Sequence, residues 1–305
     1  MSNEQLRVDA ECELGQSCPG IALIIDPKPK DLGGFTVRRC LPVREQRNVG
    51  PWIFFDEMGP AEFAAGSGVN VRPHPHINLA TVTYLFAGEI LHRDSVGSYQ
   101  PIQPGDINLM VAGRGIVHSE RERPEIQQQP HPLHGLQLWL ALPEADEECE
   151  PAFYHYPAAQ IPTLELAGVP VRVMIGSAYG VTSPVKTFFE TLYLEARLQQ
   201  GQSLKLPNVT ERALYLTRGE LELNGTVLKA RQLVVLHPGA ELEVKALSEC
   251  QLALIGGQSI GKRYIEWNFV SSRKERIEQA KADWQAGRFA TVPGDEKEFI
   301  PLPGS

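Results

Sequence analysis

The sequence of 305 residues has few cysteines, and none are paired at the spacing of a redox or zinc site. No CxxC motif occurs, and an odd number of thiols cannot all pair within one chain. The five cysteines are Cys12, Cys18, Cys40, Cys149 and Cys250. This usage is typical of reduced thiols, so we expect a cytoplasmic protein without a disulfide framework.

Long hydrophobic runs and basic blocks are also missing. No stretch is long enough to span a bilayer, and the first residues, MSNEQLRVDAECELG, lack the basic and apolar segments of a secretory signal. The net charge is -8, and no cluster of Lys and Arg is interleaved with aromatic residues. We therefore expect neither a membrane protein nor direct binding to nucleic acid.

Helical periodicity is scarce, and short alternating runs take its place. Apolar and polar residues alternate in segments bounded by Gly, Pro, Asn and Asp, which is typical of all-β sandwiches and barrels. The predicted strands include residues 79–86, 134–142, 171–176, 187–196 and 250–257. Apolar residues at 42% and charged residues at 22% indicate a globular chain. The sequence thus predicts an all-β fold.

One late segment does have the period of a helix. Ser272 and Glu275 have the spacing of a capping box, and Ile277 and Trp284 fall on one apolar stripe. Gly287 stands where a helix should stop. We predict a packing helix here, with no role in chemistry.

An internal repeat predicts two similar domains. YLFAGEIL (84–91) matches YLTRGELE (215–222) at an offset of 131, and PGD (104–106) is echoed by PGA (238–240) at an offset of 134. A strand, a glycine turn, a second strand and a Pro-Gly turn therefore occur twice. The chain is long enough for two domains, each with its own core.

The domain boundary is predicted in the Pro- and acid-rich stretch LPEADEECEPAF (142–153). Residues 1–146 would form a first domain that binds metal, and residues 147–262 a second domain without metal. Residues 263–305 would form a tail that contains the helix.

Two pairs of metal-ligating residue types have the spacing of strand neighbours. His74 and His76 lie in VRPHPHINL, and His118 and Glu120 lie in GRGIVHSER. Residues i and i+2 of a strand point to the same face, so the four side chains can converge on one ion. Imidazole with carboxylate suits one divalent transition metal such as Fe, Mn, Co, Ni or Zn, and the sequence does not choose among them.

The second half has no such residues at the equivalent positions. The offset of 131 places Lys205 and Pro207 at the positions of His74 and His76, and the offset of 134 places Leu252 and Leu254 at those of His118 and Glu120. We therefore predict a packed apolar interior for the second domain.

Several residues near the predicted ligands have open roles. His92 is predicted to form a structural hydrogen bond rather than to bind metal, because HRDS leads into a turn. Phe54, Val82, Tyr84 and Met110 are candidates for an apolar wall around the ion, although each is also a candidate for the barrel core.

The segment from HPH through TVTYLF and GEILHRDS, followed by PGD and GRGIVHSE, resembles the pirin family of the cupin superfamily. The tail RYIEWNFVSSRKERIEQAKADW (263–284) is similar to that of bacterial pirin-like proteins. The resemblance implies a bicupin, with two β-sandwich domains side by side and a C-terminal helix that packs back on the first. It implies metal ligands at His74, His76, His118 and Glu120, with Fe(II) as the preferred ion.

Two positions depart from the family pattern. Asn78 follows HPHI where Gly is common, and LMVAG (109–113) stands where WMTAG is common. Both lie near the predicted cavity, so the natural substrate is left open.

The resemblance implies a metal-dependent dioxygenase of the quercetin 2,3-dioxygenase type, which opens a flavonol-like aromatic substrate with O2. Glu120 would be both ligand and catalytic base. The alternative is a metal-binding interaction or regulatory protein with a protein partner and no physiological catalysis.

Overall fold

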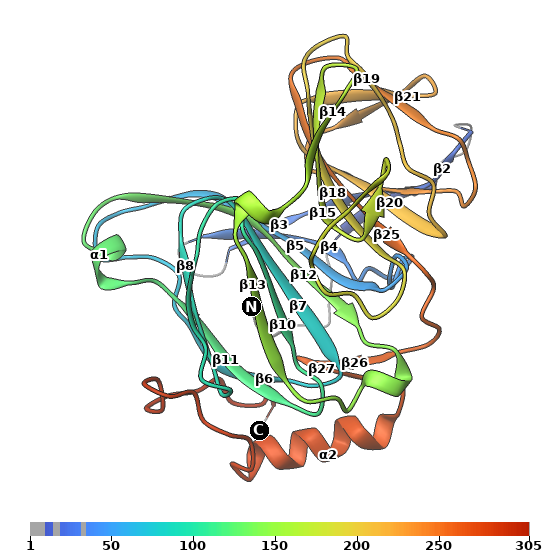
Figure 1. Cartoon of the computed structure of the whole chain (residues 1–305). Coiled ribbons are helices and arrows are strands. Elements are labelled where there is room, and N and C mark those ends of the chain that lie inside the picture. Colours follow the sequence, from blue (N-terminus) through green and yellow to red (C-terminus); the bar gives the residue numbers. More distant parts are fainter. Residues whose placement is uncertain (1–9, 15–18, 32–34, 305) are drawn as a thin grey trace.

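The computed structural model describes residues 10–14, 19–31 and 35–304, and most of its regular structure is β-strand. Figure 1 shows two β-domains that lie against each other, with helix α2 (Lys274–Gln285) on the far side of the first. The predictions of an all-β chain, two sandwich domains and a late helix are confirmed.

The first domain is a sandwich of two antiparallel sheets. Its larger sheet contains, in order, β13 (Ala152–Tyr156), β10 (Ile107–Val111), β7 (Leu79–Ala87), β12 (His131–Ala141), β5 (Trp52–Phe63), β4 (Thr36–Leu41) and β3 (Pro29–Asp31). Its smaller sheet contains β6 (Val71–His76), β11 (Ile116–Arg121), β8 (Ile90–Asp94) and β9 (Tyr99–Ile102).

The second domain repeats this plan. Its larger sheet contains, in order, β1 (Ala10–Leu14), β2 (Ile21–Pro27), β23 (Leu233–Leu236), β20 (Glu211–Arg218), β25 (Cys250–Gly257), β18 (Thr191–Leu198), β15 (Val169–Ile175) and β14 (Thr163–Leu166). Its smaller sheet contains β19 (Ser203–Lys205), β24 (Glu243–Ala246), β21 (Glu220–Leu223) and β22 (Thr226–Lys229).

Short elements complete the described part of the chain. Two hairpins pair β16 (Ser177–Ala178) with β17 (Val181–Thr182), and β26 (Tyr264–Glu266) with β27 (Phe269–Ser271). The remaining helical elements are α1 (Pro124–Gln127), η1 (Glu144–Asp146) and η2 (Ala158–Gln160). Among the described residues, no helix is long and apolar enough to cross a membrane.

The two domains exchange strands across the predicted boundary. Strand β2, from the beginning of the chain, pairs with β23 of the second domain, so that Leu23 lies opposite Val235. Strand β13, which follows the predicted boundary, pairs with β10 of the first, so that Phe153 lies opposite Met110. The divisions after residues 146 and 262 stay predictions, and sheet membership does not follow a single cut in the chain.

The repeat places the same tight turn in both domains. Gly88 follows β7 and Gly219 follows β20, and both have a φ of 88°. A Cβ atom at either position would lie 2.3 Å from a carbonyl oxygen, that of Pro132 or that of Glu249. Glycine is required where φ is positive and backbone approaches this closely. The matched turns support the interpretation of the sequence repeat as a duplicated unit.

An extended apolar core lies between the two large sheets and joins the domains. The rings of Phe55 on β5 and Tyr215 on β20 are 4.8 Å apart between centroids. The indole Nε1 of Trp52 donates to two carbonyl oxygens of the second domain, those of Leu192 at 3.2 Å and Gly256 at 3.0 Å. The two domains therefore pack as one body.

The interior of the second domain is apolar, but the predicted equivalence of Leu252 and Leu254 to His118 and Glu120 is wrong. These two leucines lie on β25, the counterpart of β12 in the larger sheet, and are fully buried in a cluster of aliphatic side chains between the two sheets. The counterpart of β11 is β24, where Val244 and Ala246 are buried in the same cluster. Lys205 is exposed, and its Nζ forms an ion pair with Glu241 at 2.6 Å. The prediction of an apolar second interior is confirmed for the described residues.

The C-terminal segment returns to the first domain, as predicted. Phe269 on β27 forms a parallel bridge with Ile77, directly after β6. Glu147, which is buried, accepts hydrogen bonds from the backbone N of Ser272 at 2.8 Å and from its Oγ at 2.9 Å. Glu147 also forms an ion pair with Nε of Arg263 at 3.1 Å. The segment between the domains thereby anchors the tail beside β6.

The predicted capping box of α2 is wrong. The N-cap residue is Arg273, one residue later than predicted, and no side chain caps the helix. The hydroxyl of Ser272 donates to Glu147 instead, and it does not cap the first turn. The predicted end is confirmed, since Gly287 follows the C-cap Ala286 with a φ of 66°.

Replacing Ile277 by alanine should destabilise the protein by about 2–5 kcal/mol, the usual cost of truncating a buried aliphatic side chain. Ile277 is 3% exposed and packs in a cluster with Ile77 and Phe269. Urea denaturation of the full chain measures the loss. Gln279→Ala on the exposed side of α2 is the control, and an equal effect of the two variants would contradict the packing.

Candidate metal centre

Neighbouring strands of the smaller sheet bring three histidines together. Strands β6 and β11 are antiparallel partners, so that His118 lies opposite His74 and Ile116 lies opposite His76. The alternation of the strand then directs His74, His76 and His118 to the same face, toward the interior of the first domain. The three side chains are buried.

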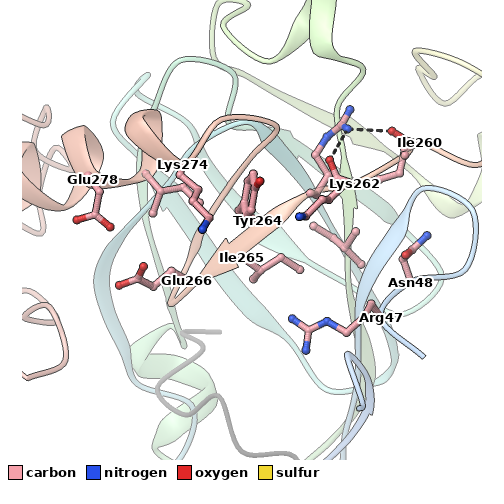
Figure 2. Close-up of a pocket in the computed structure, with 13 residues that line it drawn as sticks. Arg47, Asn48, Ile260, Lys262, Tyr264, Ile265, Glu266, Lys274 and Glu278 are labelled. Carbon is pink, nitrogen blue, oxygen red and sulfur yellow. Dashed lines mark hydrogen bonds between the residues drawn. The ribbon is translucent and has the colours of Figure 1, made fainter. Parts of the chain in front are cut away.

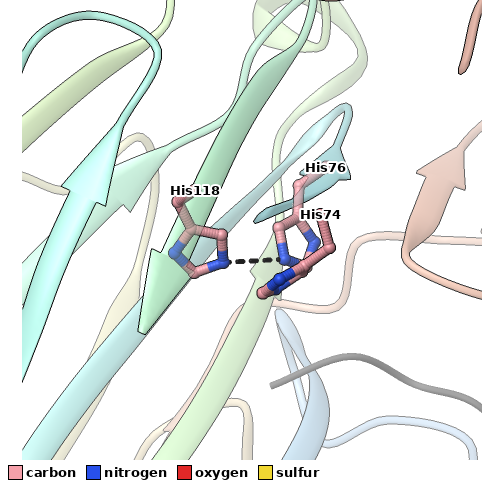
Figure 3. A group of neighbouring side chains, drawn as sticks. All are labelled: His74, His76 and His118. Carbon is pink, nitrogen blue, oxygen red and sulfur yellow. Dashed lines mark hydrogen bonds between the residues drawn. The ribbon is translucent and has the colours of Figure 1, made fainter. Parts of the chain in front are cut away.

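The three imidazoles converge as the sequence predicted (Figure 3). Nε2 of His76 lies 3.1 Å from Nε2 of His118. One nitrogen from each of His74, His76 and His118 lies within 4.8 Å of the others. This separation is that of atoms which share one ion, so the group could hold a single divalent metal.

Backbone carbonyl groups orient two of the rings. Nδ1 of His74 hydrogen-bonds the carbonyl oxygen of Arg72 at 2.9 Å. Nδ1 of His76 donates to the carbonyl oxygen of Asn268 at 3.2 Å, and Asn268 lies in the turn between β26 and β27. A carbonyl can only accept, so each Nδ1 carries the proton and each Nε2 keeps its lone pair for a metal.

The third ring is oriented through a second histidine. Nδ1 of His118 lies 3.4 Å from Nδ1 of His92, and Nε2 of His92 lies 2.8 Å from Oδ2 of Asp94. If Asp94 accepts the proton on Nε2 of His92, the Nδ1 of His92 can accept from His118. The chain of contacts then leaves Nε2 of His118 free to bind metal. The structural hydrogen bond predicted for His92 is confirmed.

The imidazole nitrogens of the site have the protonation state and the missing hydrogen-bond partner that a metal ion requires. Nε2 of His74 is buried and has no hydrogen-bond partner among the described residues. Burial lowers the pKa of His74 to about 3, and it lowers the pKa values of His76 and His118 well below the ordinary value. All three rings are therefore neutral near pH 7, which is the form that ligates metal.

Glu120 lies further along the same strand but outside the three-histidine group. Its side chain is 2% exposed, and it pairs with His92 in the register of β11 and β8. A shift of register between His118 and Glu120 interrupts the pairing of β11 with β6. The carboxylate is not among the atoms that lie within 4.8 Å of one another. Its role as fourth ligand stays a prediction.

The apolar wall near the histidines differs in part from the one predicted. Phe54 and Met110 belong to a cluster around Trp139, whose ring stacks on Phe54 at 4.0 Å and lies 5.0 Å from the ring of His76. Val82 and Tyr84 lie instead in the core between the domains. Both faces of β7 are buried, so the alternation along it did not show which face meets the histidines.

Asn78 lies at a turn, and its side chain donates hydrogen bonds to backbone carbonyl groups. Its φ is 58°, a conformation that favours glycine and is tolerated by asparagine. Its amide Nδ2 donates to the carbonyl oxygen of Glu147 at 2.5 Å and to that of Gly113 at 3.3 Å. Asparagine in place of the glycine common in the family therefore retains the turn conformation. It also adds a hydrogen bond to the segment between the domains.

Replacing Asp94 by asparagine should weaken metal binding about 10- to 100-fold, as the loss of an outer partner of a ligating histidine usually does. Oδ1 of Asp94 accepts hydrogen bonds from the backbone N of Val96 and of Ser98. The side-chain oxygen of an asparagine would continue to accept these two bonds. Its amide nitrogen would then face His92 and donate to Nε2. The proton of His92 would then lie on its Nδ1, which faces Nδ1 of His118. His118 would have to accept there and carry its own proton on Nε2, the nitrogen that should bind metal.

Metal affinity, measured by competition with a chelator, tests this prediction. Asp106→Asn is the control, because Asp106 is also buried and accepts a backbone hydrogen bond, from Ala158, on a strand connection outside the site. Equal affinities of the wild type and Asp94→Asn would contradict the role of Asp94.

Two cupin-type sandwiches side by side, with a buried three-histidine group in the first, define a bicupin with a candidate metal centre. The family model described as Pirin matches residues 34–140, and that described as Pirin C-terminal cupin domain matches residues 193–290. The chain belongs to the pirin family.

Relatives and solved structures agree with this membership. A pirin-like protein of Caulobacter vibrioides is 46% identical over 93% of this chain and 99% of the relative. A protein of Pseudomonas aeruginosa named as a candidate quercetin 2,3-dioxygenase is 36% identical over 89% of this chain and 87% of the relative. The crystal structure of a quercetin 2,3-dioxygenase from Acinetobacter baumannii has a TM-score of 0.85 at 31% identity, and the match covers 92% of this chain and 95% of that one.

Proposed function

We propose that the protein is a dioxygenase that opens a flavonol-type substrate with O2 and depends on one divalent transition metal, preferably Fe(II). The observation that carries the proposal is the set of three neutral, buried imidazoles, with the unpartnered Nε2 of His74 among them. The similarity to proteins named for quercetin 2,3-dioxygenase activity supports the choice of reaction.

The ligands in this proposal are His74, His76, His118 and Glu120. Three imidazoles and one carboxylate suit Fe(II), and they also suit Mn, Co, Ni or Zn. When bound, such an ion supplies Lewis-acid chemistry and a position for a substrate oxygen. The hydrogen bonds of Nδ1 to Arg72 and Asn268 keep two of the imidazoles in the required orientation.

Glu120 is proposed as the general base. It is the carboxylate two residues after His118, and it is buried in the same domain interior. As a carboxylate beside a flavonol hydroxyl, it would take the hydroxyl proton and leave an electron-rich enolate that reacts with O2. The proton would be held at one of its two carboxylate oxygens. The expected reaction opens the central ring and releases carbon monoxide.

Aromatic side chains near the histidines would orient the substrate. Trp139 and Phe54 stack beside His76, and the ring of Phe153 stacks on His92 at 4.2 Å between centroids. The indole Nε1 of Trp139 is buried and has no hydrogen-bond partner among the described residues. It is therefore available to donate to an oxygen of a flat aromatic ligand.

A cytoplasmic location is part of the proposal. Within the described ranges, Cys40, Cys149 and Cys250 are free thiols. Burial raises the pKa of Cys40 well above its ordinary value, so this thiol is not a nucleophile. Thiols that stay reduced are typical of a cytoplasmic protein.

The test is oxygen uptake with quercetin by protein loaded in turn with Fe, Mn, Co or Ni. At least one loaded form should consume O2 faster than the same concentration of free ion. If none does, the dioxygenase proposal is wrong, and the metal-bearing interaction protein takes its place.

A further inference from the structure

A pocket lies outside the metal centre, between the loop that contains Arg47 and the C-terminal segment. It has a volume of about 650 Å³. Its apolar lining comes from Ile53, Ile260, Ile265 and Ile277, of which the first and last are buried in the adjoining cores. A pocket of this size is large enough for a small organic molecule.

Three cationic side chains surround this pocket (Figure 2). Arg47, Lys262 and Lys274 are exposed, and none forms an ion pair with a carboxylate of the described residues. Arg263, a fourth cation of the lining, is instead held by Glu147. Three unpaired cations thus face one hollow on a chain whose net charge is -8.

A tyrosine ring holds two of these cations over the pocket. Nζ of Lys262 lies 4.9 Å from the centroid of the Tyr264 ring, and Nζ of Lys274 lies 5.2 Å from it. Figure 2 shows the two lysines on opposite sides of the ring. Attraction to the ring's π-electrons keeps both ammonium groups near the pocket without neutralising them.

Carboxylates limit the charge of a ligand. Glu266 and Glu278 lie on one side of Ile265, and Lys262 and Arg47 lie on the other (Figure 2). Both carboxylates are bound to Nζ of Lys281, at 2.5 Å and 3.2 Å. A ligand with an anionic group at each end would be repelled at the glutamate side, so the pocket favours a single anionic group on an apolar body.

We propose that this pocket binds a small organic monoanion, a carboxylate or sulfonate with an aromatic or aliphatic body. The anionic group would lie among Arg47, Lys262 and Lys274, and the apolar body would lie against Ile265 and its neighbours. The site is separate from the three histidines and does not depend on the proposed oxygenase reaction.

The probe is 8-anilino-1-naphthalenesulfonate, a monoanion with an aromatic body, followed by its fluorescence on titration into the full-length protein. N-phenyl-1-naphthylamine, which has the same rings without the sulfonate, is the neutral probe. The triple variant Arg47→Gln, Lys262→Gln, Lys274→Gln removes the cations without entering a core. Lys186→Gln is the matched control, because Lys186 also lies over tyrosine and phenylalanine rings, at 5.2 Å and 5.1 Å, on another surface.

The wild type and Lys186→Gln should bind the sulfonate equally, and the triple variant should bind it about tenfold more weakly, because three exposed charges act on one anion. The triple variant should bind the neutral probe as the wild type does, which also shows that its apolar lining is intact. Two results would overturn the proposal: no binding of the sulfonate by the wild type, or equal binding by the wild type and the triple variant.

Discussion

The double substitution His76→Ala, His118→Ala should reduce bound metal from about one ion per chain to almost none, since it removes two of three convergent imidazoles. These are the two residues whose Nε2 atoms lie 3.1 Å apart. What remains is His74 with, at most, the proposed ligand Glu120, and two ligands cannot close a site for a transition metal. Elemental analysis of protein purified without added metal measures the loss.

His155→Ala is the control for this experiment. His155 is half-buried on β13, its Nδ1 bonds the side chain of Asn108, and it does not belong to the three-histidine group. It should keep the metal content of the wild type. Full metal content in the double variant would refute the assignment of the site.

Glu120→Gln should slow oxygen uptake with quercetin about a hundredfold to ten-thousandfold, the usual cost of losing a general base. Glutamine has the shape of glutamate but neither its charge nor its basicity, so the flavonol hydroxyl would keep its proton. The three histidines are untouched, so the variant should retain at least part of its metal. The two readouts, metal content and oxygen consumption, therefore separate the role of a base from that of a ligand.

Glu122→Gln is the matched control, because Glu122 is also buried but pairs with His131 at 3.0 Å outside the histidine group. Its oxygen uptake should stay near that of the wild type. If Glu120→Gln keeps both its metal and its rate, Glu120 is not the base.

The sequence predicted the three-histidine group from the spacing of ligand-type residues within each strand. Residues two apart share a face, and the pairing of His118 with His74 across β11 and β6 then joins the two motifs. The same argument placed Glu120 with them. It could not predict the register shift after His118, because a bulge depends on pairing with a partner strand and not on the local sequence.

Contacts between segments that are distant in the sequence could not be predicted either, because they depend on how the chain folds. The carbonyl oxygen of Asn268 that orients His76 lies 192 positions further along the chain. The hydroxyl of Ser272 donates to Glu147, and no side chain caps α2, although Ser272 and Glu275 have the spacing of a capping box. The spacing of a local motif does not show which distant groups its side chains contact.

The alternation of side chains along a strand does not show which face meets which neighbour when both faces are buried. Val82 and Tyr84 share one face of β7, and Thr81 and Thr83 share the other. Both faces are buried, one against the second domain and one toward the interior of the first. The sequence showed that β7 is a strand, but the assignment of its faces needed the position of the second domain.

Carbon monoxide release distinguishes the proposed ring opening from other reactions that consume O2. Metal-loaded wild-type protein is mixed with quercetin and O2, and carbon monoxide and consumed O2 are counted together. We expect about one carbon monoxide per O2, catalysed by the wild type and lost in the double variant His76→Ala, His118→Ala. Oxygen consumption without carbon monoxide, or the same release from both proteins, would contradict it.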